Sequence, residues 1–232
     1  CHPTEQVRHG ADVDAWLHEM RSVRLRGVCA MSTDPYDQAL VAQLADDNDA
    51  VLPCFGVHPW AAHTISLQNP SPPAREHYAA LFRVQDVDVA LLDALPPPTP
   101  LDEVLAQLRA YLTRYSHALV GEVGIDRSFR LPYPGSAPRR LTRYQTTIEH
   151  QLAVLEPQVR LACQLRRSIS MHSVRAAGHT TNLLARFAAW EGFCDIGASL
   201  GRLCSHRHCA AQLHAESREY SPGAGRCLSP GH

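Results

Sequence analysis

The chain has 232 residues, with 22 Lys and Arg against 23 Asp and Glu, so its formal net charge is −1. This length allows one large domain or two small ones with a sizeable core, and the near-zero charge leaves room only for a local basic groove as a nucleic-acid surface. The sequence contains no run of about 18 apolar residues, so it predicts no membrane span. It also contains no basic start followed by an apolar stretch, so it predicts no secretory signal.

The predicted elements follow from apolar spacing and from turn residues. In chain order they are a helix over residues 12–20, a strand over 25–31, a helix over 35–44, a strand over 50–57, helices over 74–83 and 101–115, a strand over 118–122, a helix over 141–165, a strand over 168–172 and a helix over 176–190. Thr33 or Asp34 is expected to cap the second helix, which starts at Pro35, and Pro157 to kink or break the long one. Alternation of strands and helices predicts a parallel α/β sheet or barrel.

The eight cysteines fall into two groups. Cys1, Cys29, Cys54 and Cys163 are scattered among apolar segments, which fits reduced, buried thiols in a cytoplasmic or nuclear protein. The other four lie among histidines near the end of the chain, but no C-x-x-C pair occurs and their spacing matches no usual zinc finger. They are Cys194, Cys204, Cys209 and Cys227. Since the chain opens on Cys1 rather than Met, we expect that its true start is missing.

Polar residues lie where three predicted strands end. Glu122 ends the strand over 118–122 with a glycine on either side that leaves its side chain uncrowded, His172 ends a later strand, and His58 opens the loop His58-Pro59-Trp60. In a barrel of parallel strands these ends converge on one face, so residues distant in sequence become neighbours.

His2, Glu122 and His172 therefore form a candidate ligand set for zinc, manganese or magnesium. A metal there would acidify bound water and polarise a phosphoryl oxygen. Structural alternatives remain open for each residue: His2 as a frayed terminal side chain, Glu122 as the partner of an arginine, and His172 as a core histidine bonded to backbone. His58 either binds a substrate phosphate or orders its Pro59-Trp60 loop.

Several segments together resemble the TatD-type metal-dependent hydrolases. Cys1-His2-Pro3-Thr4 resembles the end of the D-x-H-x-H-P-T opening, Gly56 to Pro59 the G-x-H-P motif, and Gly121 to Asp126 the G-E-[IV]-G-[LI]-D motif. Gln158 to Leu165 is similar to the Q-x-x-L-A-x-x-L helix, and Ser170 to Val174 to a strand that ends in a metal-binding His. The sequence around residues 31–37, 58–60 and 127–129 is most similar to the fungal branch, the Cut-nine-interacting proteins.

The resemblance implies a TIM-type (β/α) barrel with two divalent metal ions that hydrolyses DNA phosphodiesters by a metal-activated water. It implies His2 as the second ligand of the opening H-x-H pair, Glu122 as the carboxylate bridging both metals, and His172 as a ligand of the second metal. Glu122 and His58 are then the candidate catalytic residues, with His58 in a substrate or supporting role. Asp126 is expected to brace the loop that carries Glu122.

The chain departs from the family pattern at both ends. The first His of the opening pair would lie before Cys1, and neither the later H-x-F-x-G motif nor the closing S/T-D motif follows Trp190. We therefore expect an incomplete barrel over residues 1–190, with the first and last strands missing or altered, and an irregular, off-family tail over residues 191–232.

The resemblance implies DNA as substrate and a protein partner from a cell-cycle complex, while the lack of a long apolar run predicts no membrane partner. Because part of the family's ligand set is missing, two alternatives stay open. One is a catalytically inactive interaction protein that keeps a partial barrel as a binding surface, and the other is a chain that forms no stable fold.

Overall fold

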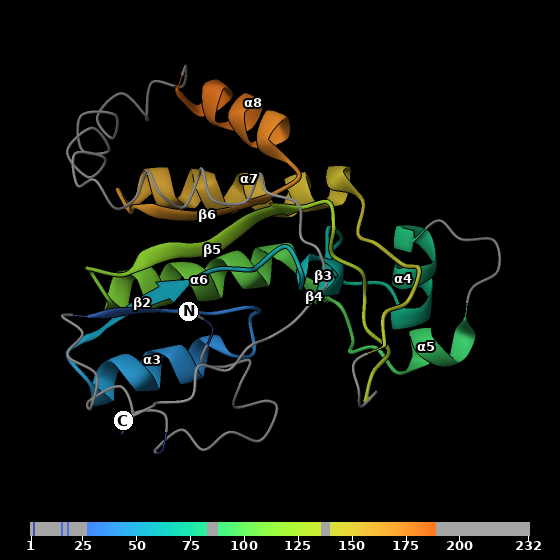
Figure 1. Ribbon diagram of the computed structural model, residues 1–232, viewed down its shortest axis with the longest axis horizontal. Helices are drawn as coiled ribbons and strands as arrows, with labels where there is room; N and C mark the ends of the chain where they lie inside the picture. Colours follow the sequence, from blue (N-terminus) through green and yellow to red (C-terminus); the bar gives the residue numbers. More distant parts are fainter. Residues whose placement is uncertain are drawn as a thin grey trace, which may run out of the picture.

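The computed structural model describes residues 2, 15, 18, 27–82, 88–135 and 140–188 (Figure 1). In chain order the elements are β1 (Val28–Met31), α3 (Gln38–Asp47), β2 (Val51–Phe55), the 3₁₀ turn η1 (Ala62–Thr64), β3 (Ile65–Ser66), α4 (Ala74–Phe82), α5 (Val89–Asp93), β4 (Thr99–Pro100), α6 (Leu101–Arg114), β5 (Leu119–Asp126), α7 (Ile148–Gln164), β6 (Ile169–Val174) and α8 (Ala177–Ala188). Apart from residues 15 and 18, which are helical, the predicted helix over residues 12–20 lies outside the described residues, as does the tail over residues 191–232.

A four-stranded parallel sheet organises the fold. Its strand order is β1-β2-β5-β6, and each pair of neighbouring strands is parallel. Helices connect successive strands. Figure 1 shows the neighbouring strands β2, β5 and β6 of this sheet, with α6, α7 and α8 beside them. The predicted α/β class is confirmed, and the architecture is a partial (β/α) barrel. The short strands β3 and β4 form a separate parallel pair.

The main core lies between the sheet and the helices that connect its strands. Apolar side chains on one face of α3, α6 and α7 pack against alternate residues of the strands. Val41, Leu108 and Val159 represent the three helices in this core, and each is fully buried. A second cluster joins α4 and α5 to Leu131 and Tyr144. Helices α4 and α5 lie beyond one end of the sheet (Figure 1). Among the described residues, none of the helices is both long enough and apolar enough to cross a membrane.

The prediction for the start of α3 is wrong by three residues. The helix begins at Gln38 with Asp37 as its N-cap, not at Pro35 with Thr33 or Asp34. The Asp34 carboxylate accepts hydrogen bonds from the backbone N–H groups of Tyr36 and Asp37, and the Asp37 carboxylate accepts one from Thr33. These short-range bonds stabilise a turn in the segment that was expected to be the first helical turn.

The predicted helix over residues 141–165 is also too long at its start. Residues before Thr147 pair instead with the segment after Phe129, since Leu141 forms an antiparallel bridge with Pro132. Helix α7 begins only where the Thr147 side chain accepts a hydrogen bond from the His150 backbone N–H. It then runs through Pro157 to Gln164 without a break.

Strand β5 corrects the prediction for Glu122. The strand continues through Asp126, so Glu122 lies within it and a different carboxylate ends it. The flanking glycines serve the contact with β6 rather than open space around Glu122. A Cβ added at Gly124 would lie 1.8 Å from the His172 carbonyl oxygen, and one at Gly121 would lie 2.7 Å from Ser170 Cβ.

Candidate metal centre

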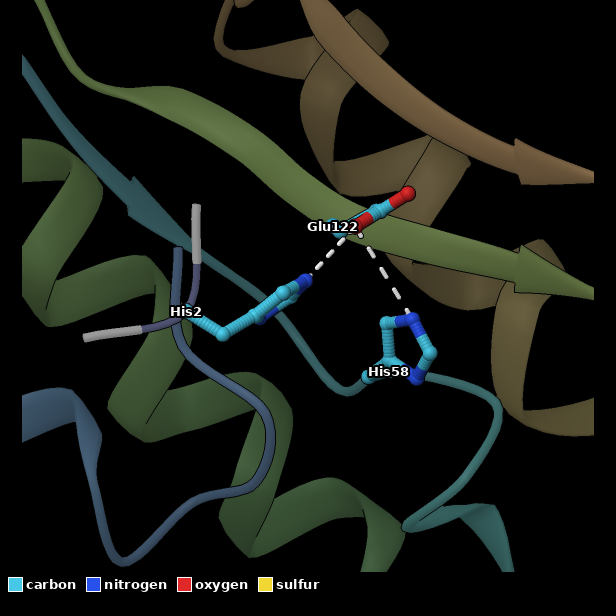
Figure 2. A group of neighbouring side chains, drawn as sticks. All are labelled: His2, His58 and Glu122. Carbon is cyan, nitrogen blue, oxygen red and sulfur yellow. Dashed lines mark hydrogen bonds and ion pairs between the residues drawn. The ribbon is translucent and has the colours of Figure 1, made fainter. Parts of the chain in front are cut away.

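Three side chains from distant parts of the sequence converge beside β5. Figure 2 shows His2 and His58 both pointing toward the carboxylate of Glu122. The Nε2 atom of His2 lies 2.8 Å from Glu122 Oε2, and the Nε2 atom of His58 lies 3.9 Å from the same oxygen. One donor atom from each of the three residues lies within 4.8 Å of the others. They therefore form a group with the spacing and the mixed N/O donors of a divalent-metal site.

The two oxygens of Glu122 face different histidines. While Oε2 faces His2 and His58, Oε1 lies 3.2 Å from His172 Nδ1. The His172 ring also contacts Asp126, because its Nε2 atom lies 3.1 Å from Asp126 Oδ2. His58 Nε2 and His172 Nδ1 are 3.1 Å apart, so the histidines on the two sides of the carboxylate are themselves in contact.

A bulge in β5 sets the position of Glu122. Val120 pairs with Ile169 and Val123 with Met171, so two residues of β5 oppose the single residue Ser170 of β6. A bulge re-aims side chains and increases the local twist. Glu122 is one of the two residues that oppose Ser170, and its side chain is 22% exposed, which leaves it accessible within a largely buried strand.

Asp126 organises the loop after β5. One carboxylate oxygen accepts hydrogen bonds from the Ser128 backbone N–H at 2.7 Å and the Phe129 backbone N–H at 2.9 Å. The other accepts the indole N–H of Trp60 at 2.8 Å. The Trp60 ring stacks on Phe129 with 5.5 Å between ring centroids. Asp126 thus joins the loops after β2 and β5 and holds His172 between them.

The loop that carries His58 is anchored by buried polar side chains. The Ser32 hydroxyl bonds both the N–H and the carbonyl of Gly56, and the Gln158 side chain accepts the Val57 N–H at 2.8 Å. The Trp60 backbone N–H donates to His58 Nδ1 at 3.2 Å, which leaves Nε2 facing Glu122 and His172. His58 is only 1% exposed, so its ring is held in a single orientation.

The charges of the cluster are strongly coupled. Burial disfavours ionised carboxylates, but hydrogen bonds from His172 and His2 outweigh it and hold the pKa of Glu122 well below its usual range. Burial likewise opposes ionisation of Asp126, whose pKa is nevertheless lowered by His172 and Trp60. For His172, burial is outweighed by hydrogen bonds to Asp126 and Glu122, which raise its pKa to about 9. Burial and the nearby His172 charge lower the pKa of His58 to about 3.

The donor set fits a divalent cation. Two ionised carboxylates and three imidazoles form a chain of contacts, in which Glu122 meets all three imidazoles and Asp126 meets His172. The lowered pKa of His58 keeps its ring neutral, the form that binds metals. In addition, His2 Nδ1 is buried and has no hydrogen-bond partner among the described residues. His2, His58 and Glu122 would hold one ion. Glu122 Oε1 and His172, which are in contact on the other side of the carboxylate, would hold a second.

Every residue of the predicted site lies in this one cluster. The geometry adds His58 to the predicted set of His2, Glu122 and His172, because its Nε2 belongs to the compact donor group. Sequence reasoning overlooked the side chains that position the site, namely Ser32, Trp60, Gln151 and Gln158. The Gly-x-His-Pro-Trp spacing was the available signal for Trp60, whereas nothing local in the sequence pairs Gln151 with Asp126.

Comparisons with known proteins agree on one family. The family model described as TatD related DNase matches residues 1–215. The chain is 34% identical over 236 aligned positions to the Cut9-interacting protein scn1 of Schizosaccharomyces pombe, covering 96% of this chain and 67% of that protein. It is 29% identical over 168 positions to the uncharacterized deoxyribonuclease YMR262W of Saccharomyces cerevisiae, covering 67% of this chain and 51% of that protein.

A solved structure is also similar. The crystal structure of YJJV, a TatD homolog from Escherichia coli K12, is 21% identical, covers 70% of this chain and 44% of its own, and superposes with a TM-score of 0.42. The chain thus spans about two thirds of the first curated relative and about half of the second. The family match extends past residue 190, where the barrel domain was predicted to end. With a family match over residues 1–215 and a relative at 34% identity, the chain belongs to the TatD-related DNase family.

Proposed function

We propose that the chain is a metal-dependent hydrolase that cleaves phosphodiester bonds in DNA. The observation that carries the proposal is the Glu122 carboxylate, whose Oε2 faces His2 and His58 while Oε1 faces His172. A carboxylate with nitrogen donors on both sides has the arrangement needed to bridge two ions. Bound divalent ions would supply an acidified water and polarise a phosphoryl oxygen.

The residues of the chain orient this centre. Glu122 would hold the ions together with His2 and His58, whose Nε2 atoms face its Oε2 atom. On the Oε1 side, Asp126 holds His172 through its Nε2 atom, so that Nδ1 points toward Glu122. Such carboxylate–histidine pairs fix ring orientation and strengthen the ligand, and their loss typically costs about 10–100-fold in metal affinity or activity.

The surroundings of the centre suit a nucleic acid. Trp60 and Phe129 form a stacked aromatic pair, and the Trp60 ring lies 4.6 Å from His58 and 6.2 Å from His172 between centroids. Aromatic faces bind unpaired bases by stacking. The exposed Arg127 and Arg130 follow directly after β5 and offer positive charge to phosphates beside the same loop. This local basic and aromatic surface fits the DNA substrate that the family resemblance implies.

The test is a nuclease assay on end-labelled single- and double-stranded DNA with added Mg²⁺, Mn²⁺ or Zn²⁺, and with EDTA. We expect metal-dependent cleavage that falls at least about 100-fold in Glu122→Gln, which keeps the side-chain size but loses the charge. The matched control is Glu103→Gln, since Glu103 is an exposed residue of α6. Cleavage that needs no metal, or equal cleavage by Glu122→Gln, would contradict the proposal.

An interaction protein is the second candidate function. It is favoured by the name of the S. pombe relative, which describes that protein as Cut9-interacting. We propose that the same fold serves as a partner surface for a cell-cycle complex in the cytoplasm or nucleus, where reduced thiols such as Cys29, Cys54 and Cys163 persist.

Metal analysis separates the two candidates. Purified chain with less than one equivalent of tightly bound metal, no nuclease activity, and retained binding to a Cut9-like protein would favour the interaction protein. Stoichiometric metal that is lost in Glu122→Gln would favour the hydrolase.

A further inference from the structure

The segment between β5 and α7 concentrates positive charge in an otherwise acidic chain. Between Asp126 and Glu149 the sequence has five arginines and no acidic residue, although the whole chain has a formal net charge of −1. Each of these arginines that the structure describes is exposed: Arg127, Arg130, Arg140 and Arg143. A local positive field of this kind attracts a polyanion even though the chain as a whole is nearly neutral.

This segment folds as an antiparallel arm. Pro132 forms an antiparallel bridge with Leu141. Backbone hydrogen bonds of 2.8 to 3.0 Å join the two sides of the segment around this bridge. We call residues 127–135 and 140–145 the basic arm. Because its backbone is paired, the side chains of the arm have fixed positions along it.

The two faces of the basic arm differ in burial. Leu131 and Tyr144 are buried in the apolar cluster with α4 and α5, so this face is fixed to the rest of the molecule. Successive side chains of an extended chain point to opposite sides. Arg130 and Arg143, the sequence neighbours of these two residues, therefore lie on the outer face. Leu141 lies on the same outer face and is 57% exposed.

Arg130 and Arg143 lie opposite each other on this outer face. Counted from the Pro132–Leu141 bridge they are register partners, and Arg130 Nη1 donates a hydrogen bond to the Arg143 carbonyl oxygen at 3.2 Å. Like charges at opposed positions of neighbouring strands repel each other, and a phosphate bound between them would offset that repulsion. Arginine also matches phosphate oxygens with paired N–H donors. The two arginines therefore form a phosphate-binding position.

The basic arm begins beside the metal centre. Phe129 stacks on Trp60, and the Trp60 ring lies 4.6 Å from His58 between centroids. Arg130 is the residue after Phe129. Residues 129–135, if extended, span roughly 20 Å. That length matches about six phosphates of a stacked strand, whose axial spacing is about 3.4 Å. A strand bound at the metal centre can therefore continue along the arm.

We propose that the basic arm holds the phosphate backbone of a DNA strand beyond the metal centre, with Arg130 and Arg143 as its phosphate contacts. The substrate is then an oligonucleotide rather than a mono- or dinucleotide, an inference that rests on the proposed hydrolase function. Phosphate contacts position a strand without reading its bases, so the arm binds DNA without sequence preference. A DNA strand fits better than an acidic peptide, because the aromatic pair of Trp60 and Phe129 offers stacking faces for bases.

The first test measures DNA binding by the full chain in EDTA, where no hydrolysis interferes. Fluorescence anisotropy with a labelled single strand of about 12 nucleotides gives the Kd from about 50 to 200 mM salt. We expect Arg130→Gln combined with Arg143→Gln to weaken binding about tenfold and to reduce the salt slope by about 1.4, since each lost contact contributes about 0.7. Wild-type affinity and slope in the double variant would overturn the proposal.

Single variants and competitors separate charge from structure. Arg130→Gln alone should reduce the slope by about 0.7, whereas Arg130→Lys keeps the charge and should restore the wild-type slope. The matched control is Arg109→Gln, an exposed position of α6 that should leave affinity and slope unchanged. An unlabelled trinucleotide should compete at least about tenfold less well than the longer strand. A polyglutamate peptide that competes as well as DNA would assign the arm to an acidic protein and overturn the proposal.

A cleavage assay on the same variants distinguishes this inference from the proposed hydrolase function. Metal-dependent cleavage together with wild-type DNA binding by the double variant would refute the role of the arm and leave the hydrolase standing. Binding that depends on Arg130 and Arg143, without metal-dependent cleavage, would refute the hydrolase and support the arm as a DNA-binding surface.

Discussion

Gln151→Leu tests how helix α7 fixes the end of β5. The Gln151 side chain is 3% exposed and makes three hydrogen bonds to backbone. Its Oε1 accepts the Asp126 N–H at 2.8 Å, and its Nε2 donates to the carbonyls of Asp126 at 3.0 Å and Thr146 at 2.9 Å. Leucine has nearly the same size but makes none of these bonds, so the variant strips buried polar groups without opening a large cavity.

The expected loss is about 3 kcal/mol of unfolding free energy. Leaving a buried donor or acceptor without its partner costs about 1–3 kcal/mol each. Three groups at about 1.5 kcal/mol each, partly offset by the added apolar surface of leucine, give about 3 kcal/mol. The Asp126 N–H contributes most, because its partner is a side chain rather than a neighbouring strand.

Urea unfolding followed by circular dichroism measures this loss. The matched control is Gln164→Leu, because Gln164 is an exposed glutamine of the same helix whose side chain accepts a hydrogen bond from the exposed Arg109 guanidinium at 2.8 Å. We expect the control to change stability by less than about 0.5 kcal/mol. One ordinary hydrogen bond contributes about 1 kcal/mol. If the free energy of unfolding of Gln151→Leu lies within about 1 kcal/mol of the wild-type value, the Gln151 side chain does not stabilise the backbone groups at the end of β5 as argued.

Three further predictions follow from single features. Burial lowers the pKa of His63 to about 4, so the unfolded chain binds a proton that the folded chain does not, and stability present above pH 6.5 is lost as the pH falls toward 4. Between pH 7 and pH 5, the free energy of unfolding of His63→Gln should fall by roughly 2 kcal/mol less than that of the wild type. Gly124→Ala should cost about 3 kcal/mol or more in thermal unfolding, whereas Gly178→Ala, with open space in α8, should stabilise by up to about 1 kcal/mol. Arg127→Ala should weaken DNA binding and flatten its salt dependence, measured by fluorescence anisotropy, while Arg109→Ala should not.

Much of the fold is predictable because each buried strand and helix is periodic within its own segment. The strand over Val51–Phe55 and helix α6 were placed within one or two residues. The errors fall where side chains bind the nearby backbone. Asp34 and Asp37 stabilise a turn in place of the first turn of α3, and no apolar pattern reveals that competition.

Longer-range pairing accounts for the error at β5. The apolar run stops at Val120, so a local pattern ends the strand near Glu122. Strand β6 extends it, because Gly124, Ile125 and Asp126 pair with His172, Ser173 and Val174. The glycines permit that contact, since a side chain at Gly124 would overlap the β6 backbone. A sequence shows the glycines but not the strand against which they lie.

For the site, too, the sequence predicts which residues come together but not how they are arranged. The sequence predicts which donors gather, because the ends of parallel strands converge. Their division around Glu122 depends on the β5 bulge, which turns the carboxylate so that His58 and His172 face different oxygens. His58 consequently belongs to the donor group with His2, although its sequence context suited a substrate or loop role equally well. Substituting His58 by Asn should therefore lower metal affinity as well as activity. If His58→Asn binds metal as the wild type does and loses only substrate affinity, His58 is a substrate contact and the ligand set reduces to His2, Glu122 and His172.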